Sequence, residues 1–270
     1  MKRLKIIMLL FVIVSFCGNA NASYGIGDTI QALNYTVNLE EINTSNQTIT
    51  GWTEISVVPN VNNLNYIPLD FKDLSIDSLT VNQIPAPYSH SGNRLDITLT
   101  ESISLNDTVL VKIHYHGNPF HEAWGGFHFS EDYAFNLGVG FESIPHNLGK
   151  TWFPCIDDFT DRATYDIIGT AENGLTITAG GYLVNKTDNG DNTTTWHWRI
   201  PHPIPTYLAS IAIGNYHEYS DIHISGNDTI PISIFVRPSD SSDVAGSFVN
   251  LHQVIDFFED HFGPYPFEKV

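Results

Sequence analysis

The chain has 270 residues, of which 12 are basic and 30 acidic, so its formal net charge is −18. That length suits one large domain, or one and a half ordinary ones, with enough material for a buried core. A chain this acidic repels nucleic acid and anionic lipid, so we expect neither as a partner.

The first 22 residues have the three parts of a cleavable export signal. A basic head is followed by an apolar run over residues 6–16 and by the small-x-small site Ala20-Asn21-Ala22, which precedes Ser23. As a helix, that run is too short to span a bilayer. We therefore predict a secreted or periplasmic bacterial protein with no membrane attachment after cleavage. In an alternative interpretation Cys17 carries lipid, but Phe16 stands where a small residue would be expected.

Removal of this signal would leave Cys155 as the only cysteine. One thiol cannot form a disulfide within the chain, so the fold must be stabilised by a packed core. We interpret Cys155 as a small buried apolar side chain rather than a nucleophile, because free buried cysteines are common and usually inert.

Residues 29–220 have the pattern of β-strands. Tyr35, Val37 and Leu39 alternate with polar residues, which is typical of a half-buried strand. Gly, Pro, Asn and Asp separate further apolar runs at residues 49–58, 109–115, 175–184, 194–200 and 207–219. This pattern predicts a mainly β, antiparallel sandwich or saddle-like domain over residues 23–220.

The pattern changes near the end of the sequence. Apolar residues recur at steps of three and four between Ser241 and His261, which predicts one amphipathic helix, and Gly263-Pro264 would end it. We therefore expect a second domain of mixed class from residue 221 onwards.

Three stretches of the sequence resemble the aminopeptidase N family of zinc metallopeptidases, the gluzincins. The first runs from Phe141-Glu142-Ser143 through Trp152-Phe153-Pro154-Cys155 to the strand start Arg162-Ala163-Thr164-Tyr165, and the second spans residues 205–216. The third comprises Phe257-Phe258-Glu259 and the turn Phe262-Gly263-Pro264-Tyr265-Pro266-Phe267. The chain departs from the family pattern at Gly140, Lys150 and Phe159, where Gln, Arg and Pro are usual.

This resemblance implies a specific division of the chain. Residues 1–22 would be the signal peptide, residues 23–220 the N-terminal β domain, and residues 221–270 the incomplete beginning of a thermolysin-like α+β catalytic domain. The chain would then be the N-terminal part of a secreted aminopeptidase that removes N-terminal residues from peptides. The alternative is a non-catalytic secreted β-sandwich module that binds glycan or protein.

The family's zinc motif is missing from the sequence. A gluzincin needs His-Glu-x-x-His on a helix, and after both His121-Glu122 and His217-Glu218 the second histidine is absent. We therefore expect no catalytic residue and no metal ligand in this chain, which would bind no zinc itself and be inactive alone. In the complete parent enzyme, zinc would be held by residues beyond Val270.

Glu142 is the one substrate-binding residue that the resemblance implies. An aminopeptidase must recognise a free α-ammonium group, and a carboxylate at the wall of the cleft does so through a charge-assisted hydrogen bond. Glu142 matches the family's residue for this role. The alternative is an ordinary glutamate in a surface turn.

Other polar and aromatic clusters are interpreted as structural. His114 and His116 share one face of a strand, but without a completing ligand we expect solvent-facing side chains on an edge strand. Trp196-His197-Trp198 is expected to pack within a strand rather than bind sugar. Asp157, Asp158 and Arg162 are interpreted as turn and ion-pair residues at the surface.

Overall fold

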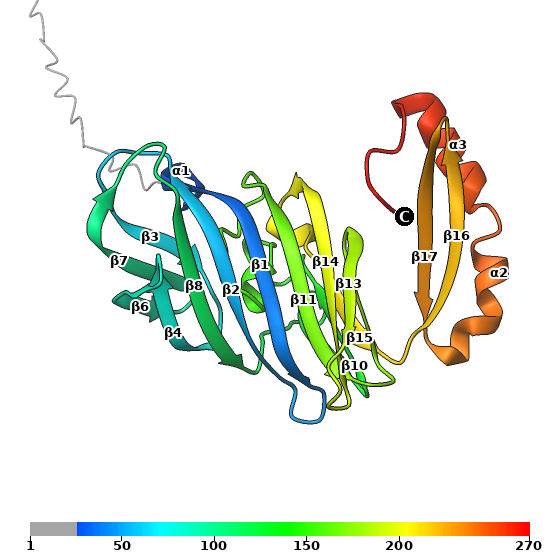
Figure 1. Ribbon diagram of the computed structural model, residues 1–270, viewed down its shortest axis with the longest axis horizontal. Coiled ribbons are helices and arrows are strands. Elements are labelled where there is room, and N and C mark those ends of the chain that lie inside the picture. The colour runs from blue at the N-terminus through cyan, green and yellow to red at the C-terminus, as the bar shows by residue number, and fades with distance from the viewer. Residues whose placement is uncertain (1–25) are drawn as a thin grey trace, which may run out of the picture.

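The computed structural model describes residues 26–270, and these form a mainly β fold (Figure 1). The predicted signal peptide, with Cys17, lies outside the described residues and remains a prediction. Within residues 26–270 no helix is long and apolar enough to cross a membrane.

A mixed eight-stranded sheet is the largest element of the fold. Its strands lie in the order β13 (Tyr182–Asp188), β14 (Thr193–Ile204), β11 (Ala163–Glu172), β1 (Ile30–Asn43), β2 (Thr48–Pro59), β8 (Val109–Gly117), β4 (Ser75–Val81) and β5 (Ile84–Pro85). The predicted alternation of β1 is confirmed, because Tyr35, Val37 and Leu39 are all fully buried. The β1–β11 pair is parallel, whereas all the other pairs in this sheet are antiparallel.

Two smaller sheets share one hydrophobic core with the large sheet. One contains β12 (Thr176–Ala179), β15 (Ile211–Gly214), β10 (Tyr133–Leu137) and β9 (Gly126–Ser130), and the other contains β3 (Leu64–Asp70), β7 (Arg94–Ile103) and β6 (Tyr88–Ser91). The apolar run at residues 175–184 is divided between two sheets. Gly180 and Gly181 separate β12 from β13, and Gly181 has a φ of 75°, a conformation that glycine adopts without strain.

The motif around Cys155 forms the centre of this core. Trp152 and Phe153 are fully buried, and the rings of Tyr35 and Tyr165 stack with their centroids 5.1 Å apart. Cys155 is itself fully buried, and burial raises the pKa of its thiol well above the usual value. The expected burial of Cys155 as a core residue is therefore confirmed.

A hairpin and helices lie beside the β sandwich at the C-terminal end (Figure 1). β16 (His217–Ser225) pairs with β17 (Asp228–Val236), and short helices η3 (Pro238–Asp243) and α2 (Val244–Ser247) precede α3 (Leu251–Phe262). The sequence predicted one continuous helix over residues 241–261, and this was wrong. A turn at residues 248–250 separates α2 from α3.

The remaining helices are short connectors. They are α1 (Ile26–Thr29), η1 (Gly149–Thr151) and η2 (Thr206–Leu208). At the C-terminus, Val270 pairs with β17 through backbone hydrogen bonds, while Lys269 donates a 3.0 Å hydrogen bond to the carbonyl oxygen of Ala179. The C-terminal residues thus connect the hairpin to the sandwich.

Candidate functional site

The loop that carries Glu142 is closed at its base by backbone pairing. Gly140 N donates to His146 O at 2.8 Å, and Leu148 N donates to Gly138 O at 2.7 Å. Residues 141–145 therefore project as the tip of a narrow loop, and Glu142 is exposed there. This loop, residues 138–148, is called the Glu142 loop below.

Buried Glu122 holds the tip of the Glu142 loop from a distant position in the sequence. Its Oε1 accepts from Glu142 N at 2.8 Å, and its Oε2 accepts from Ser143 N at 2.9 Å and Ser143 Oγ at 2.6 Å. The hydrogen bond from the Ser143 hydroxyl lowers the pKa of Glu122, so the carboxylate form is favoured. Because this carboxylate accepts from two successive backbone amides, it fixes the backbone of Glu142 and hence the direction of its side chain.

The carboxylate of Glu142 is available to bind a ligand. Within residues 26–270 no hydrogen bond or ion pair engages its carboxylate, whereas its backbone is fixed by Glu122. Exposed apolar side chains lie around the tip of the Glu142 loop, with Trp124 58% exposed, Phe141 74% exposed and Ile144 90% exposed. The rings of Trp124 and Phe141 lie 6.3 Å apart between centroids. A free carboxylate beside exposed apolar groups can bind a ligand that carries a cation next to an apolar portion.

A buried ion pair stabilises the C-terminal end of the Glu142 loop. Lys150 Nζ lies 2.8 Å from Asp157 Oδ2 and also donates to the carbonyl oxygen of Asn147 at 2.6 Å. The other oxygen of Asp157 accepts from Thr206 Oγ1 at 2.8 Å and from Gly149 N at 3.3 Å. The ion pair expected at Asp157 is confirmed, but its expected surface position was wrong, because both partners of the pair are buried.

Asp158 and Arg162, in the same segment, are at the surface as the sequence predicts. Asp158 is exposed and accepts hydrogen bonds from the backbone and hydroxyl of Thr160, as expected in a turn. Arg162 is exposed as expected, but the expected ion pair was wrong, because no ion pair of its guanidinium group is found among residues 26–270.

The histidine pair on β8 is solvent-facing in part, but β8 is not an edge strand. It lies between β2 and β4, so that expectation was wrong. His116 is exposed and pairs with Asp77 at 2.8 Å, while the ring of His114 lies against Trp52. The expected packing of Trp196 and Trp198 within a strand is confirmed, because both are buried.

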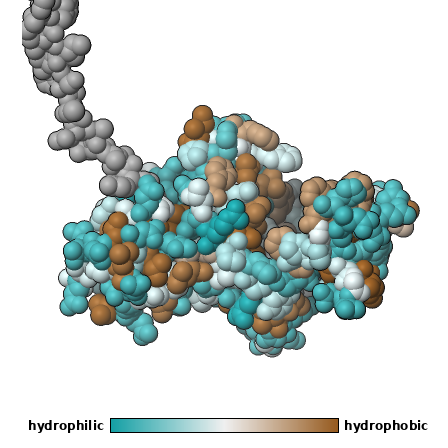
Figure 2. Space-filling view, turned by 90° about the horizontal axis from the view of Figure 1, so that it is seen from above, coloured by the Kyte–Doolittle hydropathy of each residue, from teal (hydrophilic) through white to brown (hydrophobic). Residues whose placement is uncertain are grey.

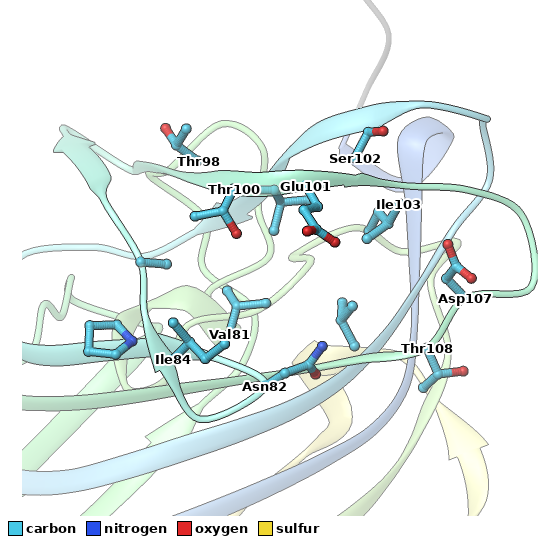
Figure 3. A pocket seen from close by; sticks show the side chains of 14 residues that line it. Val81, Asn82, Ile84, Thr98, Thr100, Glu101, Ser102, Ile103, Asp107 and Thr108 are labelled. Atoms are coloured by element: carbon cyan, nitrogen blue, oxygen red, sulfur yellow. The ribbon is translucent and has the colours of Figure 1, made fainter.

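A cavity of about 460 Å³ lies away from the Glu142 loop (Figure 3). It is lined by strands β4, β5 and β7 and by the residues that lead into β8, and it includes Glu101 and Asp107. None of its lining residues belongs to the Glu142 loop or to the segment that supports it. We therefore place the candidate substrate contact at Glu142 and not in this cavity.

Residues 31–208 match the model of the Peptidase M1 N-terminal domain. The chain belongs to this family. Its resemblance to M1 aminopeptidases is therefore confirmed, as is the mainly β fold that the resemblance implied.

Solved structures of M1 enzymes share this fold. An M1 zinc metallopeptidase from Deinococcus radiodurans superposes with a TM-score of 0.75 at 18% identity, over 91% of this chain and 58% of that chain. A mutant of that enzyme bound to a Tyr-Ser-Ala substrate gives a TM-score of 0.76, over 91% of this chain and 59% of that chain.

Relatives by sequence include both enzymes and a transcription factor subunit. Transcription initiation factor TFIID subunit 2 of Drosophila melanogaster is 23% identical over 86% of this chain and 22% of that protein. Aminopeptidase N of Streptomyces lividans is 25% identical over 40% of this chain and 12% of that protein. The chain thus spans about a fifth or less of these relatives, so their whole-protein activities do not transfer with the domain.

The catalytic zinc site implied by the M1 family does not fit the residues of this chain. His-Glu-x-x-His does not occur in the sequence. At His121-Glu122, the glutamate is already engaged by the backbone of the Glu142 loop. No catalytic step can therefore be derived through a metal at that position.

Proposed function

We propose that this chain is the N-terminal part of an exported zinc aminopeptidase and that Glu142 binds the free α-ammonium group of its peptide substrates. One observation carries this proposal. Glu142 presents an exposed carboxylate, without a partner among residues 26–270, on a loop that a buried charge holds in place. Such an anchor distinguishes a chain terminus from an internal peptide bond, which carries no charge.

Its apolar surroundings suit the first residue of a peptide. Trp124, Phe141 and Ile144 offer exposed apolar surface around the tip of the loop that carries Glu142. A substrate with an ammonium group and an apolar side chain on the same carbon could contact both features. This arrangement supports peptides as partners, whereas the charge of −18 does not favour nucleic acid.

The apolar face of α3 supports the presence of a further domain in the parent protein. Phe257, Phe258 and Phe262 are 57%, 53% and 80% exposed, whereas Ile255 of the same helix is buried. Figure 2 shows hydrophobic patches at the end of the molecule that holds this helix. Contiguous exposed aromatic residues usually mark a surface that another structure covers. We propose that the remainder of the catalytic domain, with its zinc, packs there.

A second candidate function is a non-catalytic module with the M1 N-terminal fold. The similarity to a TFIID subunit favours this second candidate, because the name of that relative describes a transcription factor and not a peptidase. The complete reading frame of the source gene distinguishes the two candidates. We expect its product to hydrolyse an aminoacyl anilide and to lose that activity with a chelator. A complete product without chelator-sensitive hydrolysis would support the binding module.

A further inference from the structure

The hairpin and α3 bring together a histidine and two carboxylates. Asp256 and Glu259 lie three residues apart on α3 and thus share one face of that helix. His223 of β16 faces them, with its Nε2 3.3 Å from Glu259 Oε2 and 3.7 Å from Asp256 Oδ1. One ligand atom from each of the three residues lies within 4.8 Å of the others.

These separations match the spacing of ligands around a zinc ion. Ligands at roughly 2.0–2.2 Å from a tetrahedral zinc stand about 3.3–3.6 Å from one another. Direct ion-paired hydrogen bonds are shorter, at about 2.7–2.9 Å. The His223–Glu259 and His223–Asp256 separations thus correspond better to two edges of a coordination tetrahedron than to direct pairs.

Glu259 is held so that one of its oxygens remains available. Its Oε1 accepts from Ser225 Oγ at 2.5 Å and from Tyr265 N at 2.8 Å, and its Oε2 faces His223. Hydrogen bonds to the second oxygen of a ligating carboxylate are a common feature of metal sites, because they fix the orientation of the ligand.

His223 is oriented in the same manner by a chain of side chains behind it. Its Nδ1 lies 3.3 Å from Nδ1 of His252, and Nε2 of His252 lies 2.8 Å from Asp221 Oδ2. If His223 Nδ1–H donates to His252 and His252 Nε2–H donates to Asp221, the Nε2 lone pair of His223 points at the two carboxylates. A hydrogen bond at the other ring nitrogen, here to His252, fixes the tautomer and the orientation of a ligating imidazole.

Burial and exposure complete the site. The side chain of His223 is only 4% exposed, whereas that of Asp256 is 63% exposed. The histidine is therefore fixed within the hairpin unit, and the cluster opens to solvent on the side of Asp256. An ion could enter there and keep a water molecule in a fourth position.

We propose that His223, Asp256 and Glu259 bind a divalent transition-metal ion, with Zn²⁺ as the best match. One nitrogen and two oxygen ligands in this spacing suit zinc, whereas Ca²⁺ and Mg²⁺ prefer oxygen ligands alone and higher coordination numbers. The bound ion links α3 to β16. This proposal revises the sequence-based expectation that the chain binds no metal.

Titration of the full chain with Zn²⁺ after removal of metal by a chelator tests this assignment. We expect one ion per chain with a micromolar or lower Kd, measured by competition with a chromophoric chelator. Asp256→Asn is the decisive variant, because this exposed carboxylate has no hydrogen bond among the described residues. It should weaken zinc binding about tenfold or more. His223→Gln should weaken it at least as much.

Asp260→Asn is the matched control. Asp260 is exposed on the same helix, and its replacement by Asn changes the charge by the same amount as Asp256→Asn. It should leave the Kd unchanged, and circular dichroism identifies any variant that fails to fold. Equal zinc affinity in Asp256→Asn and Asp260→Asn would overturn the site. No stoichiometric zinc binding, or tighter binding of Ca²⁺ than of Zn²⁺, would overturn it as well.

Discussion

The carboxylate of Glu122 occupies the space that a side chain at Gly140 would need. A Cβ built on Gly140 collides with Oε1 of Glu122, the same oxygen that accepts from the backbone N–H of Glu142. Gly140 is also a position at which this chain departs from the M1 pattern, where Gln is usual. In this chain, the carboxylate of Glu122, which comes from a distant segment, fills the space beside Gly140.

This relationship makes Glu122 a positioning residue for Glu142. In the complete enzyme, we expect Glu122→Gln to lower kcat/KM by about tenfold, because an amide group loses one of the hydrogen bonds that fix the loop. Since Glu122 is buried and binds only the loop, the loss of kcat/KM should appear for all peptides, whereas the melting temperature should change little. Steady-state kinetics and a thermal melt provide both measurements.

Gly140→Ala should have the same effect as Glu122→Gln, because the added methyl group displaces the carboxylate of Glu122. The double mutant should therefore be no worse than either single mutant. Additive losses in kcat/KM would show that the two residues act independently, contrary to this account.

Lys150 is expected to be essential for stability. Lys150→Ala leaves Asp157 as a buried charge without its counter-ion, which costs roughly 3–5 kcal/mol of unfolding free energy. Urea unfolding of the chain measures this change, with the exposed Lys186→Ala as the control. A loss below about 1 kcal/mol, the usual value for a surface pair, would contradict the buried-pair interpretation.

Asp161 is expected to make stability depend on pH. Burial raises the pKa of Asp161 from 3.8 to about 6, and its Oδ2 is buried without a hydrogen-bond partner in the part of the chain that the structure describes. Because the folded state keeps the proton to higher pH than the unfolded state, the contribution of this group to stability falls as pH rises across that window. At neutral pH, Asp161→Asn should therefore stabilise the chain by roughly 1–3 kcal/mol.

The gain from Asp161→Asn should shrink as pH falls from about 6 to about 4, as urea unfolding over this range would show. Asp70 has a pKa that burial also raises to about 6, so part of the pH dependence should persist in the variant. A gain that is independent of pH would show that Asp161 does not titrate in this range.

Much of the fold could be predicted from local patterns. The alternation at Tyr35, Val37 and Leu39 indicated a strand because side chains on a strand point to opposite faces in turn. The burial of Cys155 was expected because a free cysteine is usually a small buried apolar side chain. The break between α2 and α3 could not be predicted in this way, because the apolar steps of three and four continue across residues 248–250.

The residues of the two sites were more difficult to predict because their partners are distant in the sequence. Glu122 binds backbone amides 20 and 21 residues away, and backbone groups leave no sequence signal. His223 lies 36 residues before Glu259, so no motif spacing connects them. Glu142 was identified through family resemblance and not through any local pattern.

The isolated chain should show no aminopeptidase activity, even when zinc is supplied. The reason is that His-Glu-x-x-His is absent from the sequence, so neither the M1 metal ligands nor their general base are present. Hydrolysis of an aminoacyl anilide by the purified chain, lost on addition of a chelator, would contradict this expectation.

The central claim is that Glu142 binds the substrate ammonium group, and the kcat/KM of Glu142→Ala in the complete enzyme tests it most directly. A charge-assisted hydrogen bond contributes roughly 1.5–3 kcal/mol, so kcat/KM should fall about ten- to a hundredfold or more. Glu142→Gln should do less harm, because the amide keeps an acceptor oxygen but loses the charge.

Folding should barely change, because Glu142 is exposed and its carboxylate has no partner among the described residues, so the melting temperatures of mutant and parent should agree within a few degrees. Glu172→Ala, an exposed glutamate of β11, is the matched control and should keep full activity. The account predicts a loss of kcat/KM for Glu142→Ala at a constant melting temperature. An unchanged kcat/KM, or a loss that accompanies a large fall in melting temperature, would contradict it.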